Sequence, residues 1–363
     1  MSGPGLTALI MAGGRGERML ASGVPVPKPL VPVHGVPLLE RNLWSLARLD
    51  IDRVVVSIAR GSDRIEAYAR EVGDALGRAR SWPLEVLIED TPLGNVGCAY
   101  ALRGRTSHVL LLYADNLTLL PLEDLVAHHH RLKADLTLAT HRQTFRMPFG
   151  ALDLAHGRVT AYREKPESEY IVSSAVCVLG PAALDRLRGQ PAGLADLSAK
   201  LITDRRVVAA YEHSAPWIDV NDSASAAAAD SLVLDHRAAF ECWTPRVDAA
   251  RMLWIGRGPA GLVVEPGEGA GALPGRECSD GDDAARLIDA MRSAIGFPAA
   301  QGGERVEFDD VTRDGRFVRT YAFIDSDLPH ALLESSWSWR SEHDVLRLPE
   351  AARVLARAGL GPR

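Results

Sequence analysis

Glycines and cations gather near the start of the chain, in a pattern that suits phosphate binding. The six residues are Gly13, Gly14, Gly16, Arg15, Arg18 and Lys28. Glycines after an apolar run let the backbone turn tightly and approach a ligand, because they carry no Cβ. Amide N–H groups of such a loop favour anions. The segment predicts a polyphosphate site, with an ordinary surface turn as the alternative.

Lys28 is the residue that favours the phosphate interpretation. It stands between Pro27 and Pro29, and the restricted φ of proline presents it from a stiff, extended segment. Only four of the 41 basic residues are lysines: Lys28, Lys133, Lys165 and Lys200. In a chain dominated by arginine, a lysine indicates a need for a compact ammonium, which serves phosphate as a point charge.

A further candidate is Asp115, which follows the apolar run 109–113. This run predicts a buried strand, and a carboxylate where it emerges is costly unless the carboxylate is paired or binds a metal. A helix-capping aspartate is the alternative. Three consecutive histidines at 128–130 point in three directions on a helix and cannot chelate one ion together, so we expect a solvated helix face there.

At these residues the sequence resembles the sugar-1-phosphate nucleotidyltransferases. The resemblance lies in the run from Leu9 to Met19 and in Pro27-Lys28-Pro29-Leu30, and it covers about the first 235 residues. It implies that Arg18, Lys28 and Lys165 are catalytic, with Arg18 and Lys28 on the triphosphate and Lys165 on the attacking phosphate. It implies that Asp115 and Asp219 hold Mg²⁺. It also implies that the nucleotide contacts Leu9, Ala12, Gly13, Gly14, Arg15, Gly16, Gly94 and Asn95.

The resemblance also implies a sugar-phosphate site, formed by Gly150, Glu164, Lys165 and Ser173. Ser173 and Ala175 replace an asparagine and a glycine of the family pattern, which points to an atypical substrate. After Asp219, Asn221 replaces a glycine and is expected to keep the turn, since asparagine tolerates positive φ. Asp222 or Ser223 is expected to cap the next helix.

The rhythm of the chain predicts an α/β fold. Apolar runs at 6–12, 54–58, 84–88 and 109–113 alternate with helical patterns, which favours a Rossmann-like, three-layer nucleotidyltransferase domain over residues 1–240. A hairpin is expected at His156-Gly157. Residues 241–363 resemble a Nudix fold, an α+β domain with a helix at about 282–295. Its metal-binding glutamate positions hold Gly281, Ala290, Ser293 and Ala294, so we expect no hydrolase activity there.

The composition of the chain argues against several classes of binding partner. The net charge of −6 gives no reason to expect nucleic acid or an anionic membrane, and no apolar run approaches the length of a membrane helix. The N-terminus lacks a signal-peptide pattern, and the four scattered cysteines are typical of a reduced, cytoplasmic protein.

The function expected is Mg²⁺-dependent joining of an NTP with a sugar, heptose or cyclitol 1-phosphate, which gives an NDP-sugar and pyrophosphate, in a homo-oligomer. The resemblance favours guanylyltransferases of mannose or heptose phosphates, hence GTP. Two alternatives remain: a regulatory paralogue that binds NDP-sugar without turnover, and a Nudix-type nucleotide hydrolase.

Overall fold

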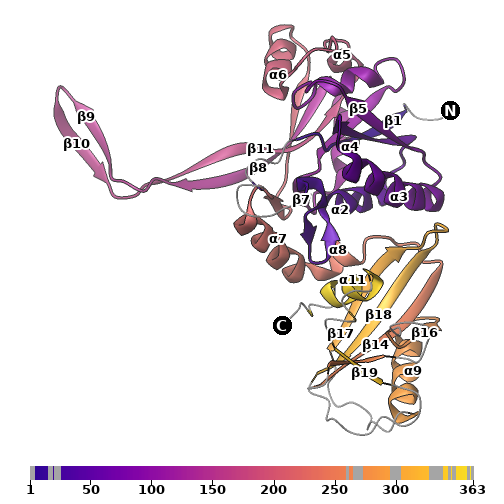
Figure 1. Ribbon diagram of the computed structural model, residues 1–363. Helices are drawn as coiled ribbons and strands as arrows, with labels where there is room; N and C mark the ends of the chain where they lie inside the picture. Colours follow the sequence, from indigo (N-terminus) through magenta and orange to yellow (C-terminus); the bar gives the residue numbers. More distant parts are fainter. Residues whose placement is uncertain are drawn as a thin grey trace.

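In a computed structural model of the chain, the N-terminal part is built on one seven-stranded sheet with helices on both faces (Figure 1). The structure describes residues 5–14, 19, 26–258, 261–264, 273–294, 304–326, 338–341, 345, 349–357 and 360. The strand order is β12-β8-β11-β6-β1-β4-β5. The strands are β1 (Leu6–Met11), β4 (Arg53–Ala59), β5 (Leu84–Glu89), β6 (His108–Tyr113), β8 (Leu136–Arg146), β11 (Glu167–Leu179) and β12 (Val208–Glu212).

The sheet is mostly parallel, as predicted. β6, β1, β4 and β5 run parallel to one another, and β12 runs parallel to β8. Only β11 is antiparallel to its neighbours β6 and β8. Because the parallel strands end at one edge, the loops that follow β1, β4, β5 and β6 meet there.

Alternating residues of the strands pack into two cores, one on each face. Ala8 and Ile10 of β1 belong to one core, and Leu9 belongs to the other. The first core is covered by α2 (Leu38–Ser45), α3 (Asp63–Arg80) and α4 (Leu122–Leu132). The second is covered by the 3₁₀ helix η3 (Gly97–Leu102), α5 (Pro181–Leu184) and α6 (Leu194–Thr203). This confirms three layers.

A long arm projects from the sheet (Figure 1). β8 and β11 continue beyond their neighbours as a two-stranded stem, which ends in a tip hairpin of β9 (Ala151–Ala155) and β10 (Arg158–Arg163). The hairpin turn lies at His156-Gly157, as predicted, and both residues have positive φ, 50° and 77°. β8 runs to Arg146, and its last five residues are exposed.

The C-terminal part forms a second sheet with the order β17-β18-β14-β15-β19, and β16 pairs with β14. Its strands are β14 (Ala249–Gly258), β15 (Gly261–Val264), β16 (Gly275–Cys278), β17 (Glu304–Val311), β18 (Phe317–Asp325) and β19 (Ser338–Arg340). Helix α9 (Gly281–Ala294) covers one face, and α11 (Pro349–Arg357) packs on the other. The helix predicted at about 282–295 is confirmed by α9, while the relation to Nudix proteins stays a prediction.

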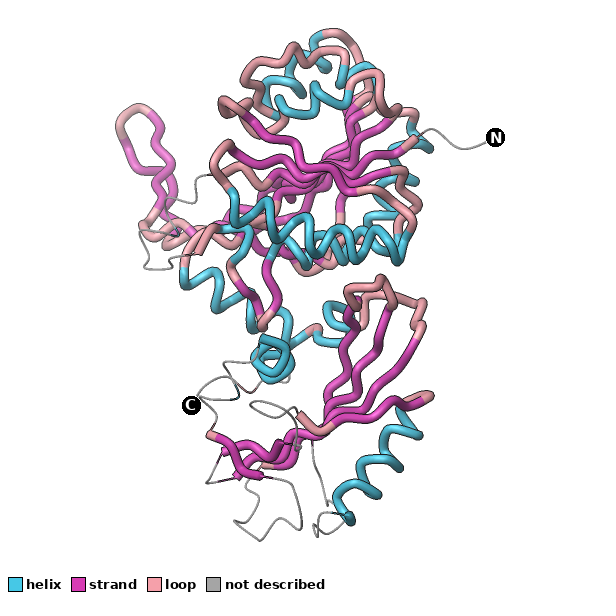
Figure 2. The backbone as a smooth tube through the Cα atoms, turned by 45° about the vertical axis from the view of Figure 1, so that its right-hand side comes forward, coloured by secondary structure: helices cyan, strands magenta, loops and turns pink. Residues whose placement is uncertain are grey.

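The two sheets are joined through α11 and α8 (Arg237–Glu241), which lie between them (Figure 2). The predicted boundary between residues 240 and 241 falls inside α8. Glu241 is fully buried and accepts hydrogen bonds from Arg41 at 2.9 Å and from Arg357 Nε at 2.7 Å. The guanidinium of Arg357 lies 4.9 Å from the Trp44 ring centroid. The junction is therefore a buried ionic contact.

None of the helices in the described part of the chain is both long and apolar enough to cross a membrane. The four cysteines, all within the described ranges, are free thiols: Cys98 and Cys177 are buried, and Cys242 and Cys278 are half-buried.

The expected solvated face at 128–130 is wrong for His129. This side chain is 1% exposed, and its Nδ1 lies 2.8 Å from Thr137 Oγ1 of β8. The adjacent His128 and His130 are half-buried. Residue 129 belongs to the face of α4 that packs on the sheet. Three polar residues in a row give no sign of this face, because residue type alone suggests that all three are exposed.

The buried His129 gives the protein an expected pH dependence of stability. Burial lowers the pKa of His129 to about 3, whereas an unfolded chain restores about 6.5. The unfolded state then binds the extra proton, so stability is lost as pH falls from about 6.5 toward 3, by about 2 kcal/mol at pH 5. Urea unfolding at pH 7.5 and pH 5 measures this. His129→Asn should lose less stability between the two values; an unchanged difference would contradict the assignment.

Candidate active site

Four side chains from three distant parts of the sequence meet at the carboxyl edge of the first sheet. The Lys28 ammonium donates to Asp115 Oδ2 at 2.6 Å and to Asn221 Oδ1 at 2.6 Å. Its Nζ also lies 3.9 Å from Asp219 Oδ1, and Asn221 Nδ2 donates to Asp219 Oδ2 at 2.5 Å. We call Lys28, Asp115, Asp219 and Asn221 the edge cluster. The sequence predicted the first three of these residues, and the structure brings them together.

Short elements hold the edge cluster in place. Lys28 begins the 3₁₀ helix η1 (Lys28–Leu30), directly after Pro27. Asp115 lies between β6 and the short strand β7 (Asn116–Thr118), which pairs antiparallel with β13 (Trp217–Asp219), so that Asp219 faces Asn116. The backbone N–H of Val220 donates to the carbonyl of Asp115 at 2.9 Å. The β7–β13 pairing therefore fixes the separation of the two carboxylates.

Asp222 is confirmed as a helix cap. Its carboxylate accepts from the backbone N–H of Ser225 at 2.8 Å, and it opens α7 (Ser223–Asp235) in a capping box. Asp222 therefore has a different role from Asp219, although only two residues separate them in the sequence.

The charge and the oxygen atoms of the edge cluster suit a bound metal ion. Two carboxylates and one ammonium give a net charge of −1, and the side chains of Lys28, Asp115 and Asp219 are 11%, 33% and 40% exposed. Asp219 Oδ1 is buried and accepts no hydrogen bond. Hard oxygen donors suit Mg²⁺, which keeps several ligands from water and phosphate. Within the described ranges, no group of three or more His, Cys, Asp or Glu side chains could hold a metal, so two carboxylates would need such added ligands.

Asn221 is the member that the sequence reading missed. We expected it to supply a turn through positive φ, but it is not among the described residues with positive φ. Its side chain instead bridges Lys28 and Asp219, and an amide is suited to this because it both donates and accepts. The position of Asn221, two residues after the candidate metal ligand Asp219, was the sequence signal that could have indicated a place in the site.

Asn221→Ala is expected to lower turnover about tenfold while the protein stays folded, because Lys28 loses one of the acceptors that orient it. Steady-state kinetics of the nucleotidyl transfer expected from the sequence measures the effect. Ser225→Ala is the matched control: it removes a hydroxyl that accepts from Asn221 N at 2.8 Å and belongs to the cap, without touching Lys28. Equal losses in both variants would assign the effect to the turn.

The structure describes only part of the glycine-rich segment that follows β1, namely Gly13 and Gly14. A Cβ on Gly13 would lie 3.3 Å from Ala59 N, whereas a Cβ on Gly14 would meet nothing within 4 Å. Close packing thus explains Gly13, and open space adjoins Gly14. Leu9 and Ala12 are buried in the two cores, so only their backbone could contact a nucleotide. The predicted Arg15, Gly16 and Arg18 lie outside the described residues.

Gly94 and Asn95 stand in the loop that follows β5. Gly94 has φ of 76°, and a Cβ there would lie 2.5 Å from Ala192 O. Asn95 Oδ1 accepts from Leu194 N at 2.8 Å, and its backbone carbonyl accepts from Tyr113 Oη at 2.7 Å. These contacts are structural, and the role of the two residues in binding a base stays a prediction.

The predicted sugar-phosphate residues lie on the arm. Gly150, Glu164 and Lys165 stand where the stem meets the tip hairpin, and Ser173 lies near the root, paired with Thr140. Tyr162 Oη donates to Glu164 Oε2 at 2.9 Å. Within the described part of the chain, the recorded contacts link none of the four residues to Lys28, Asp115 or Asp219. The fold thus separates the two halves of the predicted site.

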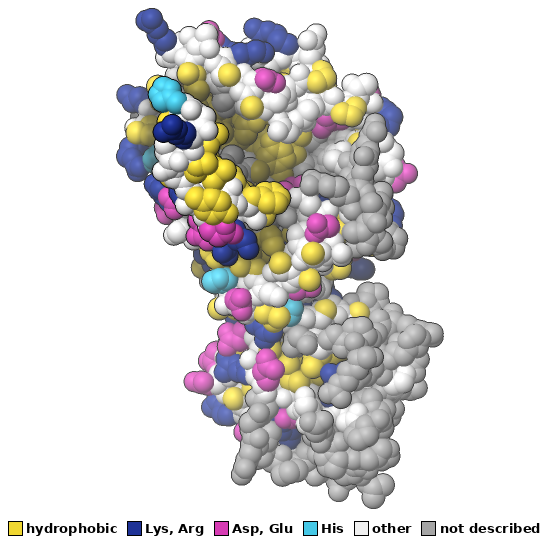
Figure 3. Space-filling model, turned by 90° about the vertical axis from the view of Figure 1, so that its left-hand side faces the viewer, with side chains coloured by type: hydrophobic (Ala, Val, Ile, Leu, Met, Phe, Trp, Pro, Cys, Tyr) yellow, Lys and Arg dark blue, Asp and Glu magenta, His cyan; other side chains and the backbone are white. Residues whose placement is uncertain are grey.

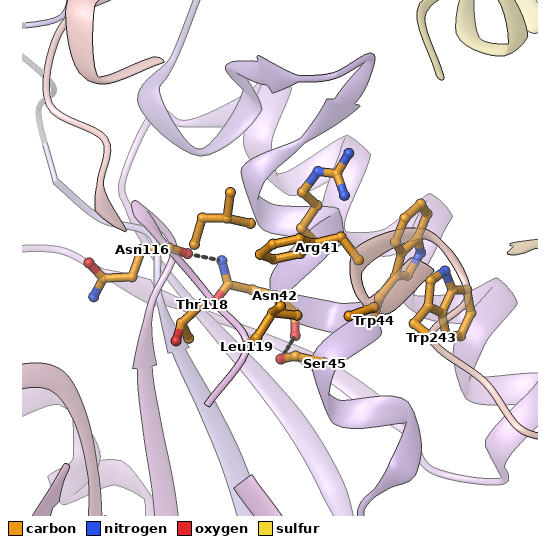
Figure 4. Close-up of a pocket in the computed structure, with 11 residues that line it drawn as sticks. Arg41, Asn42, Trp44, Ser45, Asn116, Thr118, Leu119 and Trp243 are labelled. Atoms are coloured by element: carbon orange, nitrogen blue, oxygen red, sulfur yellow. Dashed lines mark hydrogen bonds between the residues drawn. The ribbon is translucent and has the colours of Figure 1, made fainter. Parts of the chain in front are cut away.

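Two cavities lie elsewhere. One has a volume of about 60 Å³ and lies behind β7, where Asn42 Nδ2 donates to the carbonyl of Asn116 at 3.0 Å (Figure 4). It has room for a few water molecules and none for a nucleotide. The other, of about 970 Å³, lies between the two sheets and includes Tyr68 and Arg353. Neither is lined by the edge cluster. Figure 3 shows a hollow with apolar walls beside the arm.

Comparison with known proteins points to one family. The family model described as nucleotidyl transferase matches residues 7–235. The chain is 30% identical over 162 residues to D-glycero-alpha-D-manno-heptose 1-phosphate guanylyltransferase of Aneurinibacillus thermoaerophilus, covering 44% of this chain and 68% of that protein. It is 24% identical over 223 residues to mannose-1-phosphate guanyltransferase beta-B of Xenopus laevis, covering 59% of this chain and 61% of the relative.

A solved structure supports the fold. A putative glucose-1-phosphate thymidylyltransferase from Bacillus anthracis, crystallised with a sucrose, superposes with a TM-score of 0.51 at 16% identity. The match covers 63% of this chain and 96% of that one. The match to the family model ends at residue 235, so the second sheet lies outside that match.

Proposed function

Because the chain belongs to the nucleotidyl transferase family, we propose that it joins a nucleoside triphosphate to a sugar 1-phosphate, releasing pyrophosphate. The observation that carries this proposal is the convergence of Lys28, Asp115 and Asp219 at one edge of the sheet. We further propose GTP as the nucleotide and a heptose or mannose 1-phosphate as the acceptor, supported by the names of the relatives.

In the proposed reaction, a phosphate oxygen of the sugar 1-phosphate attacks the α-phosphorus of the nucleotide. A new P–O bond forms, the bond between the α-phosphorus and the bridging oxygen breaks, and pyrophosphate leaves. Two anions must approach one another, so the barrier is largely electrostatic, and positioning with charge neutralisation lowers it. Asp115 and Asp219 would hold Mg²⁺, which neutralises phosphate charge when bound.

Lys28 would bind the triphosphate. It is already oriented by two oxygen acceptors, and its side chain is 11% exposed, so little conformational freedom remains to be lost on binding. Arg18 would add a second cation on the triphosphate, and Lys165 would bind the attacking phosphate. This division of roles follows the resemblance of the motifs.

The test is a grid of five NTPs against mannose, heptose, glucose and cyclitol 1-phosphates, read by pyrophosphate release and by identification of the product. Pyrophosphate with an NDP-sugar supports the proposal, and the strongest signal is expected with GTP. Formation of a nucleoside monophosphate would instead indicate hydrolysis. Binding of an NDP-sugar without turnover under any condition would assign the chain a regulatory role.

A further inference from the structure

The tip of the arm has one apolar face and one polar face. Leu154 pairs with Val159 and Leu152 pairs with Tyr162, so these four side chains share a face, and they are 65%, 58%, 49% and 63% exposed. The opposite face carries Ala155, together with the ion pair between Arg163 and Asp153, whose closest atoms lie 2.6 Å apart.

The stem carries an exposed aromatic pair on one face. Phe145 and Tyr170 lie on one face with their ring centroids 5.7 Å apart, and both are about half exposed. The other face carries the ion pair between Arg142 and Glu169, whose closest atoms lie 2.7 Å apart. A two-stranded ribbon has little stability alone, and exposed apolar side chains gathered on it mark an interaction surface. Figure 3 shows apolar side chains gathered along the arm.

The root of the arm is fastened to the body, which sets its direction. Ser174 is fully buried, and its Oγ lies 2.8 Å from His141 Nδ1 and 2.7 Å from His213 Nε2. Trp217 Nε1 donates to the carbonyl of Ser174 at 2.8 Å. Arg142 Nε donates to Glu212 of β12 at 2.6 Å. These contacts hold the root of the stem in its outward direction.

The arm leaves from the edge of the sheet where the edge cluster lies, yet it extends outward (Figure 1). It carries Glu164 and Lys165, which the proposed function requires at the sugar phosphate. A single chain therefore has the triphosphate half of the site on its body and the sugar-phosphate half on a projecting ribbon.

We propose that two copies of this chain exchange arms, so that Lys165 and Glu164 of each complete the active site of the other. This inference rests on the proposed function. A second copy fits because an apolar ribbon face can pair with its own symmetry mate about a two-fold axis, which gives a closed dimer. Since each arm starts at the edge that holds a cluster, two arms that pass one another bring each Lys165 toward the opposite edge.

Complementation tests the shared site. Asp115→Asn damages the body half and Lys165→Ala the arm half, and each variant alone is expected to be nearly inactive. Co-expressed with different affinity tags and purified through both, the mixed dimer has one site with an intact body and an intact arm. It should recover about half of the wild-type turnover per dimer. An inactive mixed dimer beside an active wild type overturns the proposal, and an inactive wild type overturns the proposed function instead.

Oligomeric state tests the surface without any assay of activity. Sedimentation velocity of the wild type should give twice the 39.2 kDa mass of the chain. Leu154→Glu, on the apolar face of the tip, should shift the protein to the monomer mass with an unchanged circular dichroism spectrum. Ala155→Glu, the adjacent residue on the polar face, is the matched control and should leave the dimer intact. A monomeric wild type, or a dimer that Leu154→Glu does not dissociate, overturns the proposal.

Discussion

Asp115→Asn is expected to lower pyrophosphate release about a thousandfold, the largest loss of activity that we predict. The substitution keeps the size of the side chain but removes one of two carboxylates, so the charge of the edge cluster changes from −1 to neutral. A neutral cluster attracts a divalent cation weakly and leaves Lys28 without its anionic partner at 2.6 Å. Asp219→Asn should act in the same way.

The control for this prediction is Asp222→Asn. It is the same chemical change three residues from Asp219, and asparagine caps a helix about as well as aspartate does. Activity and melting temperature of this variant should remain close to those of the wild type. Steady-state kinetics across a Mg²⁺ titration compares the variants: a cluster variant that restores full turnover at the Mg²⁺ concentration of the wild type would contradict the assignment.

Glu241→Gln is expected to destabilise the protein by about 3–5 kcal/mol, the largest effect on folding. Glu241 accepts from Arg41 and Arg357, and the side chains of all three residues are at most 2% exposed. Neutralising the carboxylate removes the paired carboxylate of the buried Arg41 and leaves the buried Arg357 with only Asp310, whose Oδ2 lies 3.8 Å away. Urea unfolding monitored by tryptophan fluorescence is a suitable measurement, since Trp44 and Trp243 stack at this junction with centroids 5.0 Å apart.

The matched control is Glu66→Gln, in the exposed pair that Glu66 forms with Arg70 on α3. It should cost at most about 0.5 kcal/mol. Similar costs at the two sites would mean that the buried network adds nothing particular to the junction.

The same network predicts acid sensitivity. Burial acts to raise the pKa of Glu241, but Arg357 and Arg41 outweigh it and hold this pKa at about 2, below the ordinary 4.5. The contribution of the carboxylate to stability is therefore complete above about pH 4.5, and it is lost as pH falls toward 2.

The α/β architecture could be predicted from the sequence, and three residues that the structure brings together could be named from it, because their signals are local. Apolar runs such as 109–113 and the periodicity before α3 identify the elements, and Lys28 between two prolines is visible without knowledge of the fold. The capping role of Asp222 and the turn at His156-Gly157 follow from neighbouring residues in the same way.

The tertiary structure decided the features that depend on which surfaces meet. Whether His129 lies in water or against β8 depends on how α4 is rotated on the sheet, and Asn221 joins the edge cluster only because β13 pairs with β7. The outward course of the arm follows from contacts at Ser174, across 33 and 39 residues of sequence. Periodicity and propensity report on a residue and its near neighbours along the chain, whereas burial and direction arise from pairings between distant segments.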